Sequence, residues 1–297
     1  MHACLTVFPP DKAAIVRVIA PGSVLRIGRA AECSLCIEHP SVSRSHAELR
    51  QGQAGWQLHD FGSKNGSFVD GQRVPGLQDY ALGHAGWLRF GDVYCEFALL
   101  DDAQATAAAA GRRAQRVAAT MHTSRIEGAQ NLDELLDASL RGVLELAQCE
   151  RGFVLLKQGA GFVVRASLAL DTTCLAAREF SGSIGAVQRA LESRRSVVAN
   201  DIVSDAWLSS RQSVVAAGLS ALVCVPLLDG EGALGAVYAD RVPPGEPITT
   251  LDQELLEAFA ERAALWIAAR DAAELLEAHA PAADWEAIVA AHAPEPR

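Results

Sequence analysis

The apolar positions of the first hundred residues alternate with polar ones in short runs. These runs stop at glycine, proline or Asx turn residues, as is typical of the closely spaced strands of a β-sandwich. Strands are predicted at residues 14–20, 24–27, 33–37, 46–50 and 56–59, followed by hairpins around residues 70–71 and 91–92. We therefore expect an all-β domain over residues 1–100.

From residue 131 onward the apolar period changes to that of a helix. One helical face carries Leu132, Leu135, Leu136, Leu140, Val143, Leu144 and Ala147. Further elements are predicted as strands at 152–157, 162–168, 197–198, 220–228 and 233–239, with a helix over 184–191. Thr250 and Gln253 have capping-box spacing and should open a long last helix. Because no parallel βαβ repeat occurs, residues 131–272 are expected to form an α+β domain with a mostly antiparallel sheet.

Two further segments lack a dense apolar stripe. Residues 101–130 are rich in alanine and carry Arg112, Arg113 and Arg116, which predicts a partly helical linker. Residues 273–297 are rich in alanine and glutamate and contain Pro281, so a tail that is helical in pieces is expected there. The predicted organisation is thus two domains, a linker and a tail.

Composition narrows the class of protein. The 297 residues are 50% hydrophobic and 21% charged, which allows two domains with ordinary cores. No apolar run approaches a membrane span and the first residues do not resemble a secretion signal, so a cytoplasmic location is expected. The net charge of −10 argues against broad binding to nucleic acid or to an anionic membrane.

The residue types also exclude several chemistries. Lysine occurs only as Lys12, Lys64 and Lys157, so no Gly-Lys-Ser/Thr phosphate loop exists, and the protein-kinase motifs are absent. Cys33 and Cys36 have CxxC spacing, but no second pair lies at zinc-site spacing, and we interpret them as structural. No catalytic residue, metal site or cofactor is expected.

Cationic and short hydrogen-bonding residues recur where the predicted strands end. Gly28 and Arg29 follow one strand, residues 41–47 (Ser-Val-Ser-Arg-Ser-His-Ala) precede another, and residues 63–66 (Ser-Lys-Asn-Gly) follow a third. This spacing places them together at the loop end of a sandwich. A phosphate, with about −1.5 to −2 charges and three strong acceptors, suits such a surface.

The order and spacing of these motifs resemble a forkhead-associated (FHA) domain. The resemblance is carried by Ile27, Gly28, Arg29, Cys33, Ile37, residues 40–47, Gly62, Ser63, residues 65–69 and residues 90–92. It implies a β-sandwich that binds phosphothreonine peptides through its loops. Ser67 departs from the family, which usually has threonine there; we expect this change to affect packing more than binding.

The resemblance and the residue chemistry together predict five ligand contacts. Arg29 is the expected main phosphate contact, because its guanidinium is a rigid and permanently charged fork. Ser43 can donate its hydroxyl to a phosphate oxygen, and Arg44 and Lys64 are second-line contacts. Asn65 can hydrogen-bond the peptide backbone with its carboxamide.

Three further residues are expected to support this site. Gly66 permits the tight turn after Asn65 and belongs to the predicted peptide-binding set, while Gly28 supports the site beside Arg29. The resemblance makes His46 a structural residue that ties the loops together. A catalytic His46 is not expected, because no acidic partner for a Ser-His-Asp arrangement is apparent in the sequence.

Residues 131 to about 270 resemble a GAF domain, a small-molecule-sensing and dimerising module. The resemblance is carried by residues 184–191, 195–204, 218–227 and 235–240 and by the last helix. The Asn-Lys signature of cyclic-nucleotide binders is absent, because Leu156 precedes Lys157. Between His122 and His279 there is no histidine, which excludes a His-ligated haem.

Other ligands of this domain stay open. Cys149, Cys174 and Cys224 are interpreted as small buried hydrophobes rather than as bilin attachment points. Trp207 and Arg211 lie in the segment that often covers the pocket in this family. Two interpretations stay open: the segment packs as a lid and the domain binds no ligand, or the domain senses an unknown small ligand. The helices over 131–148 and 250–270 fit a homodimer built as a helical bundle.

The sequence therefore predicts a non-enzymatic cytoplasmic signalling adaptor. Its first domain would bind a phosphothreonine-containing protein, such as a Ser/Thr kinase or its substrate, and its second would sense a small ligand or dimerise. One alternative is a small-molecule sensor whose first domain is only a scaffold. Another is a self-regulated switch in which phosphorylated Thr106, Thr120 or Thr123 is captured by the first domain.

Overall fold

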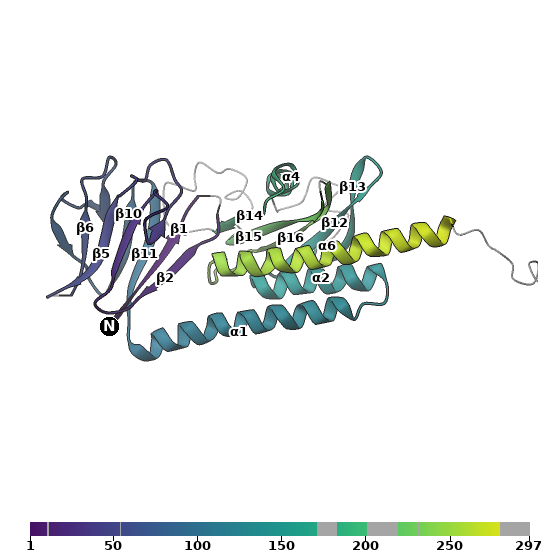
Figure 1. Ribbon diagram of the computed structural model, residues 1–297, viewed down its shortest axis with the longest axis horizontal. Helices are drawn as coiled ribbons and strands as arrows, with labels where there is room; N and C mark the ends of the chain where they lie inside the picture. The colour runs from purple at the N-terminus through teal and green to yellow at the C-terminus, as the bar shows by residue number, and fades with distance from the viewer. Residues whose placement is uncertain (11, 54, 171–182, 201–218, 231, 280–297) are drawn as a thin grey trace, which may run out of the picture.

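The molecule consists of two domains that lie side by side. The computed structural model describes residues 1–10, 12–53, 55–170, 183–200, 219–230 and 232–279. A β-sandwich at the N-terminal end adjoins a sheet that is layered with long helices (Figure 1). Trp207, Arg211 and Cys174, singled out in the sequence, lie outside the described residues.

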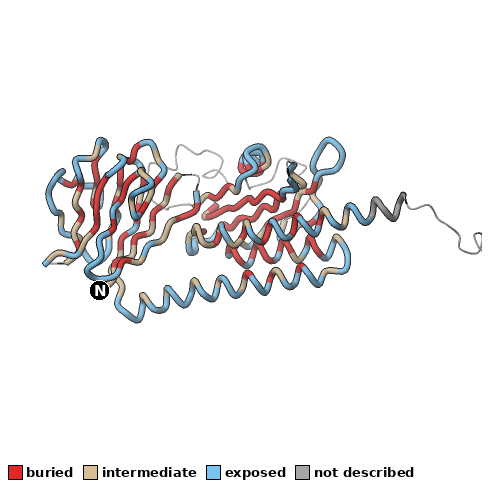
Figure 2. Tube along the Cα trace, viewed as in Figure 1, coloured by how far each residue is buried: buried red, intermediate tan, exposed pale blue. Residues whose placement is uncertain are grey.

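Two sheets form the first domain. One has the strand order β2-β1-β11-β10-β7-β8 and the other the order β4-β3-β5-β6-β9. The strands are β1 (His2–Phe8), β2 (Ile15–Ile19), β3 (Val24–Gly28), β4 (Leu35–Cys36), β5 (Ala47–Gly52), β6 (Gly55–Asp60), β7 (Ser67–Val69), β8 (Gln72–Arg73), β9 (Asp79–Ala81), β10 (Ala85–Phe90) and β11 (Val93–Leu100). Their inward residues make one apolar core between the sheets (Figure 2).

Most strands lie where alternation predicts them, with three differences. The predictions did not include β1, although its burial alternates strictly and it pairs with both β2 and β11. They also missed β9, a short strand paired with β6. The strand expected at 33–37 shrinks to β4, because only Leu35 and Cys36 pair with β3. Short strands at sheet edges are decided by their partners and leave little pattern in the sequence.

The second domain has a five-stranded antiparallel sheet, as expected. Its strand order is β13-β12-β16-β15-β14. Its strands are β12 (Arg151–Gln158), β13 (Gly161–Leu168), β14 (Val197–Asn200), β15 (Ala221–Asp229) and β16 (Gly232–Arg241). One face packs against α2 (Leu132–Ala147) and α6 (Thr250–His279), and the other against α4 (Ile184–Ser193), as Figure 1 shows.

The segment expected to be a partly helical linker is one continuous helix, α1 (Asp102–Glu127). Asp101 and Gln104 form a capping box at its start, and alanine favours the helix along its length. Near its end Ala119, His122 and Ile126 are buried in the core of the second domain. Thus α1 is a third helix beside α2 and α6 and not a free tether. Within the described ranges no helix is both long and apolar enough to cross a bilayer.

The last helix begins one residue earlier than its capping signal suggested. The reciprocal bonds join Thr249 and Asp252: the Asp252 carboxylate accepts from the Thr249 amide at 2.7 Å, and the Asp252 amide donates to the Thr249 hydroxyl at 3.3 Å. The predicted partners Thr250 and Gln253 do not form the box. Gln253 donates to Glu257 on the next turn instead.

A contact between the domains explains this shift. Ala14, between β1 and β2, forms a parallel bridge with Thr249. Its amide donates to the Ile248 carbonyl at 2.9 Å, and its carbonyl accepts from the Thr250 amide at 2.8 Å. The Thr250 amide is therefore engaged by the first domain, which leaves Thr249 as the capping residue.

The ring of Phe259 holds the helical layer together. It is 2% exposed, lies edge-on to His122 of α1 and fills the space that a side chain at Gly142 of α2 would need. We expect Phe259→Ala to lower the free energy of unfolding of the second domain by about 3–5 kcal/mol, because the cavity would open between three helices. Glu254→Ala, an exposed change on the same helix, should stay within about 0.5 kcal/mol. Urea unfolding followed by circular dichroism measures both, and equal effects would contradict this role.

Candidate functional site

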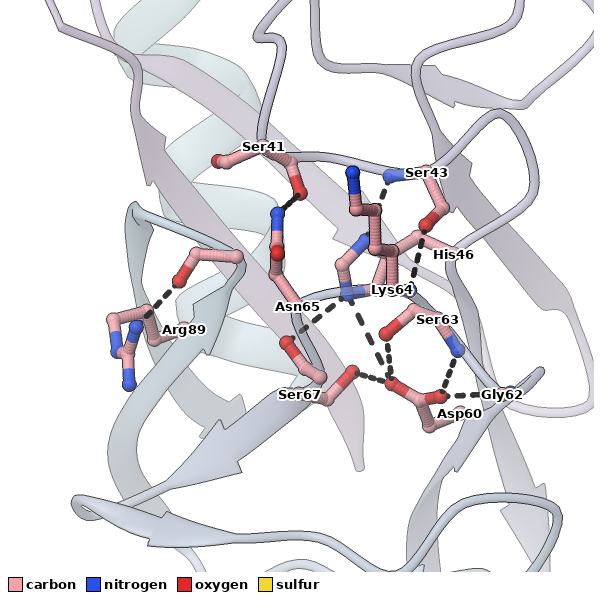
Figure 3. A network of polar contacts seen from close by, with 12 residues as sticks. Ser41, Ser43, His46, Asp60, Gly62, Ser63, Lys64, Asn65, Ser67 and Arg89 are labelled. Atoms are coloured by element: carbon pink, nitrogen blue, oxygen red, sulfur yellow. Dashed lines mark hydrogen bonds and ion pairs between the residues drawn. The ribbon is translucent and has the colours of Figure 1, made fainter.

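Three loops meet at one end of the sandwich and bring the predicted site residues together. Arg29 follows β3, Ser43 and Arg44 lie just before β5, and residues 64–66 lie between β6 and β7. Figure 3 shows Ser43, Lys64 and Asn65 close together above a buried polar network, with the Ser43 hydroxyl turned toward the Lys64 main chain. The loops after β3, before β5 and after β6 thus each supply one part of the site.

Asp60 is the centre of this network. The carboxylate is 2% exposed and lies at the end of β6. One oxygen accepts from the amides of Gly62 and Ser63 at 2.8 and 2.7 Å. The other accepts from the hydroxyls of Ser63 and Ser67 at 2.7 and 2.5 Å. Burial alone would raise the pKa of Asp60, but these hydrogen bonds outweigh it and hold the pKa below 3.8, its ordinary value.

His46 links two of the loops from below, the one that carries Ser43 and the one that carries Gly66. Its Nδ1 accepts from the Ser43 amide at 3.0 Å, so the ring proton is on Nε2, which donates to the Gly66 carbonyl at 3.3 Å. Nε2 also lies 3.8 Å from the Asp60 carboxylate. The ring is fully buried, and burial lowers its pKa below 6.5, its ordinary value, despite the attraction of Asp60.

This geometry corrects one prediction and supports another. His46 does have an acidic neighbour, Asp60, which the sequence did not reveal because Asp60 ends β6 whereas His46 lies just before β5. Yet Nδ1 is occupied by a main-chain amide, so the ring faces no nucleophile. The bonds to Ser43 and Gly66 are those of a residue that positions loops.

Ser43 and Lys64 are joined across two loops. The Ser43 hydroxyl oxygen accepts from the Lys64 amide at 3.1 Å. Because that bond uses an oxygen lone pair, the hydroxyl proton remains available to donate. Ser43 is half-buried, whereas the side chain of Lys64 is exposed.

Asn65 is oriented by the opposite loop. Its Nδ2 donates to the Ser41 carbonyl at 2.8 Å, which leaves the carboxamide oxygen available to accept. Ser41 is itself fixed, because its hydroxyl accepts from the Asp92 amide at 2.8 Å. Arg89 braces the same corner by donating to the Gly91 carbonyl and stacking over the Phe68 ring at 3.7 Å.

The cationic residues of the site carry unneutralised charge. Arg29, Arg44 and Lys64 are exposed, and none of them forms an ion pair with a described residue. Arg29 is held in place, because its Nε donates to the Val42 carbonyl at 3.3 Å and its amide to the Ser43 carbonyl at 2.9 Å. In contrast, Arg50 on the sheet surface is paired with both Glu48 and Asp79.

Two glycines are required where the loops approach one another. A Cβ at Gly28 would lie 2.2 Å from the Arg44 carbonyl oxygen and 2.7 Å from the Cys33 sulfur. Gly66 has a φ of 81°, a left-handed conformation that glycine adopts without strain. The Cys33 thiol donates to the Arg44 carbonyl at 3.2 Å and the Cys36 thiol to the Arg29 carbonyl at 3.5 Å, so both cysteines contact the main chain of the site.

Sequence reasoning missed the residues that hold the loops. Asp60, Ser41, Ser63 and Arg89 were not among the predicted site residues. For Asp60 a signal existed, because an aspartate followed by Gly62 and Ser63 has the spacing of an Asx turn. The other three have roles that depend on contacts with distant segments.

Comparison with protein families agrees with the geometry of both domains. A model of the FHA domain matches residues 25–91, and a model of the GAF domain matches residues 131–267. The chain contains an FHA domain followed by a GAF domain. The first match spans all three loops of the site, and the second begins at the residue that caps α2.

Two individual proteins match a short part of the chain. Human kanadaptin is 38% identical over 76 residues, which cover 22% of this chain and 10% of that protein. The Mycobacterium tuberculosis ABC transporter ATP-binding/permease protein Rv1747 is 36% identical over 64 residues, which cover 22% of this chain and 7% of the relative. The matched part is thus a tenth or less of the length of these relatives.

Two solved structures of FHA domains also resemble part of the chain. The crystal structure of FHA-1 of Rv1747 is 29% identical, covers 33% of this chain and 97% of that chain, and has a TM-score of 0.27. The N-terminal FHA domain of Rad53 from S. cerevisiae is 17% identical, covers 36% and 99%, and has a TM-score of 0.31.

The GAF domain has a polar cluster on the α4 side of its sheet. The Arg151 guanidinium pairs with the fully buried Asp240 at 2.5 Å, and the Tyr238 hydroxyl donates to the same carboxylate at 2.7 Å. Burial, followed by the charge of Asp240, raises the pKa of Tyr238. The cluster ties the start of α4 to the sheet, because the Tyr238 hydroxyl accepts from the Ser183 amide at 3.0 Å.

Burial also governs the two described cysteines that were considered for cofactor attachment. It raises the pKa of Cys149 to about 12 and that of Cys224 to about 12. A thiol with such a pKa has almost no thiolate at neutral pH and is a poor nucleophile. Both therefore behave as small apolar side chains.

The buried His46 makes the FHA domain sensitive to mild acid. Since its pKa in the folded chain lies below 6.5, its ordinary value, the unfolded chain binds this proton more readily. The stability that the neutral His46 ring contributes is therefore fully present above pH 6.5. It is lost as the pH falls from 6.5 through the lower pKa of the folded chain. We expect urea titrations of the first domain to show this loss, and His46→Gln, which keeps a donor and an acceptor but does not titrate, to flatten it. An equal slope in the variant would assign the effect to another group.

Proposed function

We propose that the chain is a cytoplasmic signalling adaptor whose FHA domain binds a phosphothreonine-containing partner protein. The observation that carries the proposal is the group of three unpaired cations, Arg29, Arg44 and Lys64, around the free donor of Ser43. A protein with a net charge of −10 that leaves three cations unneutralised at one point has a local site for an anion.

Each atom of the site has a role in this proposal. Arg29 would bind the phosphate with charge-assisted hydrogen bonds, assisted by the Ser43 hydroxyl and by the exposed Arg44 and Lys64. The free carboxamide oxygen of Asn65 would accept from the peptide main chain. The bonds of Asp60 and His46 keep these groups in position before the ligand arrives, which reduces the entropy lost on binding.

We assign sensing or dimerisation, and no catalysis, to the GAF domain. Support for a homodimer comes from large apolar residues that remain exposed on its helices: Val117 and Met121 of α1, and Leu265 and Trp266 of α6. They are 38–67% exposed, although neighbouring apolar residues of the same helices are buried. A second copy of the chain would cover them.

Two alternatives remain distinguishable from the adaptor. In a sensor with a scaffold FHA domain, phosphothreonine peptides would not bind. In a self-regulated switch, Thr106, Thr120 or Thr123 would enter the site, but each of these hydroxyls donates to a carbonyl one turn earlier within α1. Their capture would require α1 to unwind, which the structure disfavours.

Arg29→Ala tests the adaptor. We expect the wild-type chain to bind phosphothreonine peptides selected from an array, and the variant to bind them about 10- to 100-fold more weakly, because charge-assisted hydrogen bonds contribute about 1.5–3 kcal/mol. Titration calorimetry gives both affinities.

Arg17→Ala provides the matched control, since it removes the same charge from β2, at the far edge of the sheet. Its affinity should equal that of the wild type. No binding by the wild type, or unchanged binding by the Arg29 variant, would refute the adaptor.

Leu265→Glu tests the homodimer. A charge on an exposed apolar helix face should weaken association without loss of folding, because Leu265 is 67% exposed in the single chain. Val24→Glu, at an exposed position of β3, is the control and should leave the association unchanged. Sedimentation velocity over a range of concentrations measures both, and a wild-type chain that stays monomeric would exclude this interface.

A further inference from the structure

A cavity of about 590 Å³ lies where the two domains meet. Its FHA side is the turn between β1 and β2, including Lys12 and Ala13. Its GAF side combines the segment that joins α4 to β14 with one face of α6. The volume falls within the range of about 300–1,000 Å³ that is usual for small-molecule sites.

The floor of the cavity is the open edge of the GAF sheet. β14 pairs with β15 only as far as Val197 and Cys224, so no strand among the described residues covers the following part of β15 on that side. Val225 and Leu228 of this part face the cavity together with Val198. The floor therefore offers apolar contact area.

The two walls carry opposite charges. Arg194 and Arg195 lie on one wall, and Glu257 and Glu261 lie one turn apart on the face of α6 that forms the other. None of these four makes an ion pair with a described residue, and Glu257 only accepts a hydrogen bond from Gln253.

We propose that this cavity binds a zwitterionic small molecule of the apolar dipeptide type. The ligand carboxylate would lie against Arg194 and Arg195. Its ammonium group would face Glu257 and Glu261, and its apolar side chains would cover Val225 and Leu228. Ligand charges would then bridge the two walls. The site lies on the α6 side of the sheet, away from the cluster of Tyr238 and Asp240, and does not depend on the phosphopeptide proposal.

Defined peptides test the charge requirement on the full chain. Unmodified leucyl-leucine, valyl-alanine and phenylalanyl-leucine should raise the melting temperature and give saturable binding by calorimetry. The same peptides with an acetylated amine, or with an amidated carboxylate, should bind about tenfold more weakly or not at all, because each loses a charge-assisted contact. No binding of any unmodified dipeptide, or equal binding of the capped forms, would overturn the proposal.

Variants locate the site. Arg195→Ala should weaken binding of the unmodified peptides, and amidated and unmodified peptides should then bind this variant equally well. Glu261→Gln should likewise bind acetylated and unmodified peptides equally well. Glu254→Gln, on α6 but outside the cavity, is the matched control and should bind as the wild type does. Melting temperatures without peptide show whether each variant is folded. Binding that is unchanged in both cavity variants would place the ligand elsewhere and overturn this assignment.

Discussion

Asp60 and His46 are buried together beneath the loops, and the whole candidate site depends on their contacts. The carboxylate would be strongly unfavourable at 2% exposure if it were unpaired. It is stabilised only because the loop after β6 folds back to donate to it, and that fold places Lys64 and Asn65 at the surface. The neutral ring of His46 connects this loop to the one that carries Ser43. A buried polar pair thus determines where exposed charges lie.

At the junction between the domains, main-chain groups of one domain are hydrogen-bonded by the other. Ala14 bonds on both sides to the segment that leads into α6, so the first domain supplies partners to a helix start of the second. The helix α1 joins the same domain at its other end, where His122 lies 3.2 Å from Glu145 of α2. The FHA and GAF domains are therefore connected by two structured contacts, and the cavity between them is lined from both sides.

The sequence predicted those elements whose hydrophobic periodicity is strong and whose contact partners are close in the sequence. The alternation of the sandwich strands and the apolar face of α2 were sufficient to predict these elements, since each of them buries one face. The predictions were less accurate where partners are remote. Thr249 and not Thr250 caps α6, because the Thr250 amide is taken by Ala14, which is distant in the sequence. Residues 101–130 contain a full helix for a similar reason, since His122 and Ile126 bury themselves against another domain.

By itself the sequence determined the class of each domain and the ligand-facing residue types, because strand and helix periods and glycine turns are local properties of a chain. It determined that Arg29, Ser43 and Asn65 lie at strand ends, and therefore on loops. Only the tertiary structure decided which atoms of these residues remain free. Ser43 keeps a donor and Asn65 an acceptor because Lys64 and Ser41, more than twenty positions away in each case, occupy their other groups. Hydrogen-bond partners across separate strands are set by how the sheets pack, and no local pattern in the sequence specifies them.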